Sequence, residues 1–123
     1  MAPAKRYVEI FIGPIACSCA GGPSPAKQEK IALAFALKNA LEKEEGFDVR
    51  TWRLGEDDDY EEGMRTLTVY LEKAGEEELA ANLSFAVNSA TPSVAVEGRL
   101  EYLAEVPTPE RFLARVRNIS VED

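Results

Sequence analysis

The positions of the hydrophobic residues predict four β-strands. The first is rich in β-branched and aromatic side chains and is followed by Gly13-Pro14, a pair that ends strands. The second alternates less regularly but consists of residue types with high β propensity. The last two flank Glu97-Gly98, which predicts a tight turn between antiparallel partners. The predicted strands cover residues 6–12, 47–54, 93–96 and 99–104.

Apolar residues at helical spacing predict helices between and after these strands. Ser24 is a predicted N-cap, with Pro25 at the first helical position, where a missing N–H does no harm. Gly75 separates two later helical pieces, and Thr108 is the predicted N-cap of the last helix. The predicted helices cover residues 26–45, 60–73, 76–85 and 109–117.

The order β-α-β-α-β-β-α predicts one α/β domain. Separated parallel strands need crossover connections, which the helices supply, and the closing hairpin adds an antiparallel pairing. We therefore expect a four-stranded mixed sheet with helices on both faces and with Trp52 in the core or on a covered edge. The domain is expected to cover residues 1–123, with an ordered core of about residues 6–117 and a frayed C-terminal tail.

Charge and composition limit the kinds of partner that we expect this protein to bind. The 123 residues include 14 Lys and Arg and 22 Asp and Glu, which gives a formal net charge of −8. Such a charge repels phosphate backbones and anionic lipid surfaces, so we expect no nucleic-acid partner and no membrane partner. No apolar stretch is long enough for a secretion signal or a membrane span, so we expect a cytoplasmic protein.

Cys17 and Cys19 are the candidate chemical groups of the chain. They are its only cysteines, and they share a loop rich in glycine and proline between the first strand and the first helix. In the cytoplasm, closely spaced thiols are seldom structural disulfides. The chain has no histidine, which excludes Ser-His-Asp and Cys-His designs and imidazole zinc sites. The acidic residues 56–62 lack calcium-loop spacing and no phosphate-loop pattern occurs, so we expect no cofactor.

The chain resembles thioredoxin-like domains over about residues 7–116. Cys17-Ser18-Cys19 lies between the first strand and the first helix, Thr91-Pro92 immediately precedes the third strand, and a hairpin and a helix close the domain. The resemblance implies a three-layer sandwich in which the Thr91–Pro92 bond is cis and lies against the cysteines. It also implies that Thr91 and Pro92 bind substrate, with Thr91 presenting backbone groups to an extended segment.

The cysteine spacing departs from the Cys-x-x-Cys motif of thiol oxidoreductases. Alternate Cα atoms of an extended chain lie about 6.5–7 Å apart, whereas a disulfide usually needs about 5.5–6 Å. A bond between Cys17 and Cys19 therefore requires a bend at Ser18, and we expect such a bond to be readily reduced. Six residues separate the pair from the predicted helix, so we expect the helix dipole to lower the thiol pKa only weakly.

Thiol–disulfide exchange is the main functional hypothesis. Cys17, the N-terminal cysteine, would attack the disulfide of a protein or small-molecule partner, and Cys19 would resolve the mixed disulfide. Lys27 is the nearest cation in the sequence and could favour a thiolate. On this hypothesis the chain is a thioredoxin-like oxidoreductase or a redox-responsive protein, acting as a monomer or a homodimer.

Two alternatives remain open. The thiols Cys17 and Cys19 could capture Cu(I), zinc or trivalent arsenic, or supply half of a site shared across a dimer, including an iron–sulfur cluster. Thioredoxin-like arsenic metallochaperones carry their cysteines in the same loop, although they usually have a vicinal pair and a third cysteine. The other alternative is that the cysteines are buried residues without chemistry in a protein-binding module.

Overall fold

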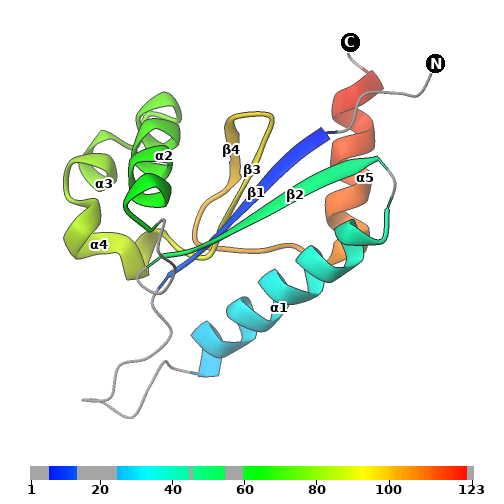
Figure 1. The fold of residues 1–123 in the computed structure, drawn as a ribbon, viewed down its shortest axis with the longest axis horizontal. Coiled ribbons are helices and arrows are strands. Elements are labelled where there is room, and N and C mark those ends of the chain that lie inside the picture. Colours follow the sequence, from blue (N-terminus) through cyan, green and yellow to red (C-terminus); the bar gives the residue numbers. More distant parts are fainter. Residues whose placement is uncertain (1–5, 14–24, 45, 55–59, 122–123) are drawn as a thin grey trace.

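The structure of the chain, a computed structural model, describes residues 6–13, 25–44, 46–54 and 60–121 (Figure 1). Its centre is a four-stranded sheet in the order β2-β1-β3-β4. β1 pairs in parallel with β2 and antiparallel with β3, and β3 pairs antiparallel with β4. The predicted mixed sheet is therefore confirmed. The strands are β1 (Arg6–Ile12), β2 (Phe47–Arg53), β3 (Ser93–Val96) and β4 (Arg99–Tyr102).

Helices cover both faces of the sheet and complete the predicted three-layer sandwich. Two of them, α1 and α5, lie on one face, and α2, α3 and α4 lie on the other (Figure 1). Within the described residues, no helix is both long enough and apolar enough to cross a membrane. The helices are α1 (Pro25–Glu42), α2 (Tyr60–Lys73), α3 (Glu77–Ala81), α4 (Leu83–Ala90) and α5 (Pro109–Val121).

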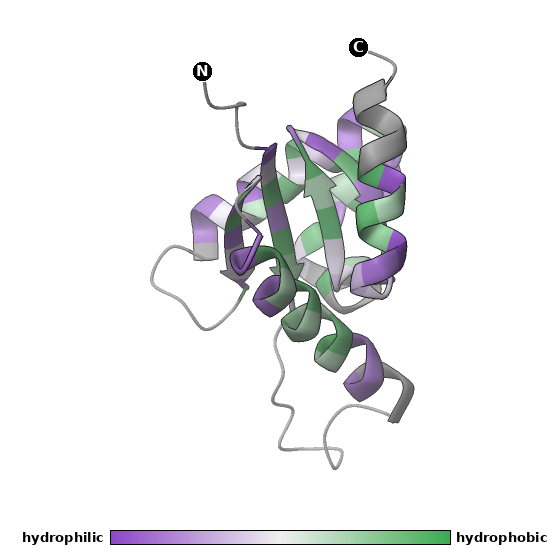
Figure 2. Cartoon of the chain, turned by 90° about the vertical axis from the view of Figure 1, so that its right-hand side faces the viewer, coloured by the Kyte–Doolittle hydropathy of each residue, from purple (hydrophilic) through white to green (hydrophobic). Residues whose placement is uncertain are grey.

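The two faces of β1 lead into two separate cores. Val8, Ile10 and Ile12 are fully buried against α1 and α5, because alternate side chains of a strand point to the same side. Glu9 and Phe11 point to the opposite face, which α2 to α4 cover. In Figure 2 hydrophobic and hydrophilic colours alternate along the strands, and α1 is largely hydrophobic in colour between its hydrophilic ends.

Helix boundaries differ from the prediction in three places. The piece predicted over residues 76–85 is two helices, α3 and α4, which meet at Asn82. The side-chain amide of Asn82 donates to the carbonyl of Glu78 at 3.0 Å and competes with the helical backbone for that acceptor. α1 ends at Glu42, three residues before its predicted end. α5 continues through Val121, where a frayed tail was expected.

The β3–β4 turn has left-handed backbone conformations at both central residues, with φ of 50° at Glu97 and 79° at Gly98. Gly98 adopts this conformation without steric cost, whereas Glu97 carries a Cβ there. The backbone of Glu97 donates to the carbonyl of Tyr7 at 2.8 Å, and its carboxylate accepts from the Tyr7 N–H at 3.3 Å. Both contacts join the turn to Tyr7, near the start of the central strand β1.

Candidate functional site

The sheet brings together the two chain segments that flank the predicted site. Phe11, near the end of β1, pairs with Ser93, the first residue of β3. The chain therefore leaves β1 beside the point where Thr91-Pro92 leads into β3. The carbonyl of Ile12 accepts from the N–H of Leu54 at 2.8 Å, which ties the end of β1 to the end of β2 on its other side. Cys17 and Cys19 follow in the sequence and lie outside the described residues.

The Thr91–Pro92 peptide bond is cis, as the resemblance implies. Thr91 is almost completely buried, and its hydroxyl donates to the carbonyl of Val87 in α4 at 2.7 Å. Pro92 is buried beside it. This hydrogen bond fixes Thr91 to the last turn of α4. The junction between α4 and β3, which we call the corner, is therefore held in place by a contact within the chain. Substrate binding by Thr91 and Pro92 stays a prediction.

A hydrogen-bond network fixes the corner from the other side. The hydroxyl of Ser93, which is fully buried, donates to the carbonyl of Ala90 and accepts from the N–H of Ala104 at 3.1 Å. Ala104 has a left-handed backbone with φ of 58°, and its carbonyl accepts from the ammonium of Lys30 at 2.9 Å. These contacts join α1, α4, β3 and the segment after β4. Sequence reasoning missed Lys30 and Ser93, because their partners are distant in the chain.

A buried carboxylate, Glu9, organises the opposite face of the sheet. Its side chain accepts from the indole N–H of Trp52 at 3.0 Å on one oxygen and from the hydroxyl of Tyr70 on the other. Burial, reinforced by the negative charge of Glu9, raises the pKa of Tyr70 above its usual value. Burial and Glu9 also raise the pKa of Tyr7, and the cation of Arg50 opposes that effect. The tyrosines therefore remain hydrogen-bond donors at neutral pH.

This arrangement is a structural anchor. Trp52 is buried and stacks on Phe11 with the ring planes 6° apart, which confirms its expected place in the core. Gly63 lets α2 come close to this layer, since an added Cβ would lie 2.8 Å from the Trp52 and Leu54 side chains. Both carboxylate oxygens of Glu9 accept bonds from protein donors, so we assign the residue to joining β1, β2 and α2. Its sequence signal was a single charge inside a hydrophobic strand.

Replacing Tyr70 by Phe is expected to lower the free energy of unfolding by about 1.5–3 kcal/mol, the range for a hydrogen bond to a charged group. The substitution removes one of the donors to the buried carboxylate of Glu9 while keeping the ring. Urea denaturation followed by circular dichroism measures the loss. The matched control is Tyr102→Phe, whose hydroxyl borders an open cavity, and it should change the stability by less than about 0.5 kcal/mol. Equal losses in the two variants would contradict the assignment of Glu9 as an anchor.

In the part of the chain that the structure describes, no group of three or more His, Cys, Asp or Glu side chains is arranged to hold a metal ion. Any soft-metal or metalloid site would therefore depend on Cys17 and Cys19, which lie outside these residues.

Comparison with known proteins gives one informative likeness. No protein-family model and no curated protein matches the sequence. Among solved structures, the chain is similar to the crystal structure of an arsenical resistance operon trans-acting repressor from Bacteroides vulgatus ATCC 8482. The TM-score is 0.51 at 18% sequence identity, with 92% of this chain and 93% of that chain covered. At this identity the likeness establishes the fold, a mixed α/β sandwich.

The comparison corrects one prediction and weakens another. The exclusion of nucleic acid as a partner was wrong, because a protein with this arrangement of elements is an operon's trans-acting repressor. The exclusion rested on the net charge, which is a sum over the chain and says nothing of local basic surfaces. Nothing in the likeness supports thiol–disulfide oxidoreductase activity, the main hypothesis. The alternative that involves arsenic agrees better with it.

Proposed function

We propose that this chain is a thiol-based metalloid-binding protein in which Cys17 and Cys19 together capture trivalent arsenic. The observation that carries the proposal is the likeness, over 92% of the chain, to an arsenical resistance operon repressor. A second support is the position of both thiols in the segment between β1 and α1. Thiolates are the side chains that bind soft ions most strongly.

The chemistry balances without an oxidant or a reductant. Each thiol of Cys17 and Cys19 replaces one hydroxyl of arsenous acid, so that two As–S bonds form and two water molecules leave. The third position on arsenic keeps a hydroxyl or takes a thiol from a small molecule or a partner. Arsenic stays trivalent and the cysteines stay at the thiol oxidation level. This reaction differs in both respects from disulfide exchange.

In this proposal, Thr91 and Pro92 form the wall next to the thiol segment. The support is the pairing of Phe11 with Ser93, which brings the end of β1 beside the cis bond. A wall held by the Thr91–Val87 and Ser93–Ala104 hydrogen bonds keeps its shape while the thiols bind or release their ligand. Rigid support of this kind lowers the entropic cost of forming a chelate.

Titration of the reduced protein with phenylarsine oxide, followed by intact-protein mass spectrometry, tests the proposal. The probe bears two exchangeable positions on arsenic, so we expect one adduct per chain and the loss of both alkylatable thiols. The same protein, alkylated across graded glutathione redox buffers, should keep Cys17 and Cys19 reduced at cytosolic potentials. A protein whose thiols remain freely alkylatable in the presence of the arsenical would refute the proposal. A reversible two-hydrogen mass change in those buffers, with no adduct, would restore the oxidoreductase hypothesis.

A further inference from the structure

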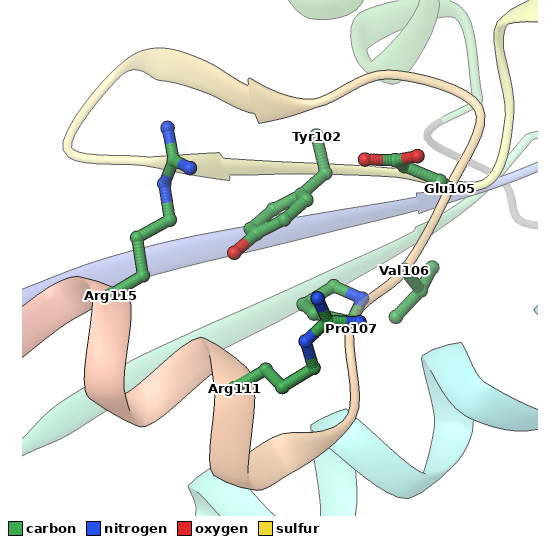
Figure 3. A pocket seen from close by; sticks show the side chains of 6 residues that line it. All are labelled: Tyr102, Glu105, Val106, Pro107, Arg111 and Arg115. Atoms are coloured by element: carbon green, nitrogen blue, oxygen red, sulfur yellow. The ribbon is translucent and has the colours of Figure 1, made fainter.

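Two neighbouring cavities open along β4, the edge strand of the sheet. The larger, of about 480 Å³, lies between the end of β4 and α5, and Figure 3 shows its lining. The smaller, of about 360 Å³, lies between β4 and the C-terminal end of α2. Arg115 of α5 lines both, so the two cavities meet at its side chain. The larger cavity is lined by Tyr102, Glu105, Val106, Pro107, Arg111 and Arg115.

Four cations from three elements converge on these cavities. We call them the β4-edge basic site: Lys73 of α2, Arg99 of β4, and Arg111 and Arg115 of α5. Arg115 pairs with Glu101, with its Nη2 3.0 Å and its Nε 3.1 Å from the same carboxylate oxygen. Within the described residues, the side chains of the other three cations form no ion pair or hydrogen bond.

The local charge is opposite to that of the whole chain. Glu101 and Glu105 are the carboxylates on the cavity walls, so four cations face two anions and leave a local formal charge of +2. The complete sequence carries −8. Unpaired cations held close together repel one another, and this repulsion is relieved when an anion binds between them. The geometry therefore favours an anionic ligand.

The donors on the cavity wall are positioned before any ligand arrives. Glu101 orients the guanidinium of Arg115, whose carbon lies 5.3 Å from the centre of the Tyr102 ring. That ring packs against Phe112, which is fully buried, with centroids 6.3 Å apart. Burial raises the pKa of Tyr102, so its hydroxyl stays protonated and can donate. In Figure 3 the side chains of Arg115, Tyr102 and Arg111 border one opening.

We propose that the β4-edge basic site binds a small tetrahedral oxyanion of the phosphate type, free or carried on a compact organic molecule. Guanidinium groups match the oxygens of phosphate in geometry as well as in charge. A small dianion in the larger cavity meets Arg111 and Arg115, and one in the smaller cavity meets Arg99 and Arg115. The two cavities, of about 480 and 360 Å³, are of the size that holds a compact ligand.

The test is a titration of the ¹⁵N-labelled full chain with inorganic phosphate in about 0.15 M NaCl, where weak surface attraction is screened. We expect saturable shifts of amide signals confined to the surroundings of Lys73 and to residues 99–102 and 111–115. Arg99→Ala and Arg111→Ala should each weaken the apparent affinity at least fivefold. Both residues are exposed, so the variants should keep the melting temperature of the wild type. The matched control is Arg65→Ala, an exposed arginine on the far side of α2, which should bind phosphate as the wild type does.

Three results would overturn the inference: shifts that never saturate, shifts that sodium chloride alone reproduces, or Arg99→Ala and Arg111→Ala variants that bind like the wild type. Binding of a duplex oligonucleotide, without any response to phosphate, would also overturn it in favour of a polyanion surface. The inference is independent of the proposed metalloid chemistry. A Cys17→Ser/Cys19→Ser variant should therefore bind phosphate as tightly as the wild type.

Discussion

Replacing either Cys17 or Cys19 by serine is expected to weaken the binding of phenylarsine oxide at least a hundredfold, which corresponds to about 2.7 kcal/mol. Once one thiol has bound, the second As–S bond forms within the same molecule, at a high effective concentration. A single cysteine loses that advantage and binds as an ordinary monothiol. The two single variants should therefore be affected to a similar extent. Competition with a small dithiol such as dithiothreitol, followed by mass spectrometry, gives the relative affinities.

The control for these variants is Ser18→Ala, which changes the residue between the thiols and keeps both sulfurs. It should bind the arsenical with nearly the affinity of the wild type. If one of the cysteine variants retained full affinity, a single thiol would be sufficient and chelation by the pair would be refuted. Loss of binding in Ser18→Ala as well would instead indicate that the substitutions disturb the segment as a whole.

Replacing Phe112 by Ala is expected to destabilise the fold by about 3–5 kcal/mol, the range for deleting a large buried aromatic side chain. The ring is fully buried between α5 and the sheet. It lies 6.2 Å from the ring of Phe47 and 6.3 Å from that of Tyr102, measured between centroids. A loss of this size is a large part of the 5–15 kcal/mol that typically stabilises a domain. Urea denaturation of the wild type and the variant at 25 °C, analysed with the same dependence of the unfolding free energy on urea concentration, measures this loss.

Phe112→Leu keeps most of the volume and should cost clearly less than Phe112→Ala. Glu110→Ala is the surface control on the same helix, because Glu110 is exposed in the first turn of α5. We expect its effect to stay within about 0.5 kcal/mol. A Phe112→Ala variant as stable as Glu110→Ala would contradict the burial of the ring between α5 and the sheet.

Local patterns predicted the strands well because their signals are contained in short windows. β1 and α2 have the predicted boundaries, α1 begins at Pro25, the predicted first helical position, and Thr108 caps α5 as the sequence indicated. The break at Asn82 was missed because apolar spacing continues through it, while one side-chain amide interrupts the helix. Contacts of long range could not be read in this way. The partners of Glu9 lie 43 and 61 residues away, and only the sheet register and the packing of α2 bring them together.

The candidate sites also differ in whether their residues lie within one short stretch of the sequence. The pair of cysteines and the Thr91-Pro92 dipeptide are short motifs, so the sequence alone drew attention to them. The β4-edge basic site is built from α2, β4 and α5, and no window of the sequence contains more than part of it. The exclusion of nucleic acid from the net charge failed for a related reason. A net charge conceals where opposite charges gather, and only the folded arrangement separates them.

At Glu97 the backbone conformation and the side-chain contact favour different residue types. By its own geometry, this position would suit asparagine or glycine, which tolerate positive φ. Glutamate is retained there with a side chain long enough to reach the Tyr7 amide. Optimising the hairpin in isolation would therefore remove the carboxylate that accepts from the Tyr7 N–H and leave only the backbone bond to the Tyr7 carbonyl. A design method that scores each turn by its local conformation alone would replace Glu97 by asparagine or glycine. It would overlook the lost hydrogen bond between the hairpin and β1.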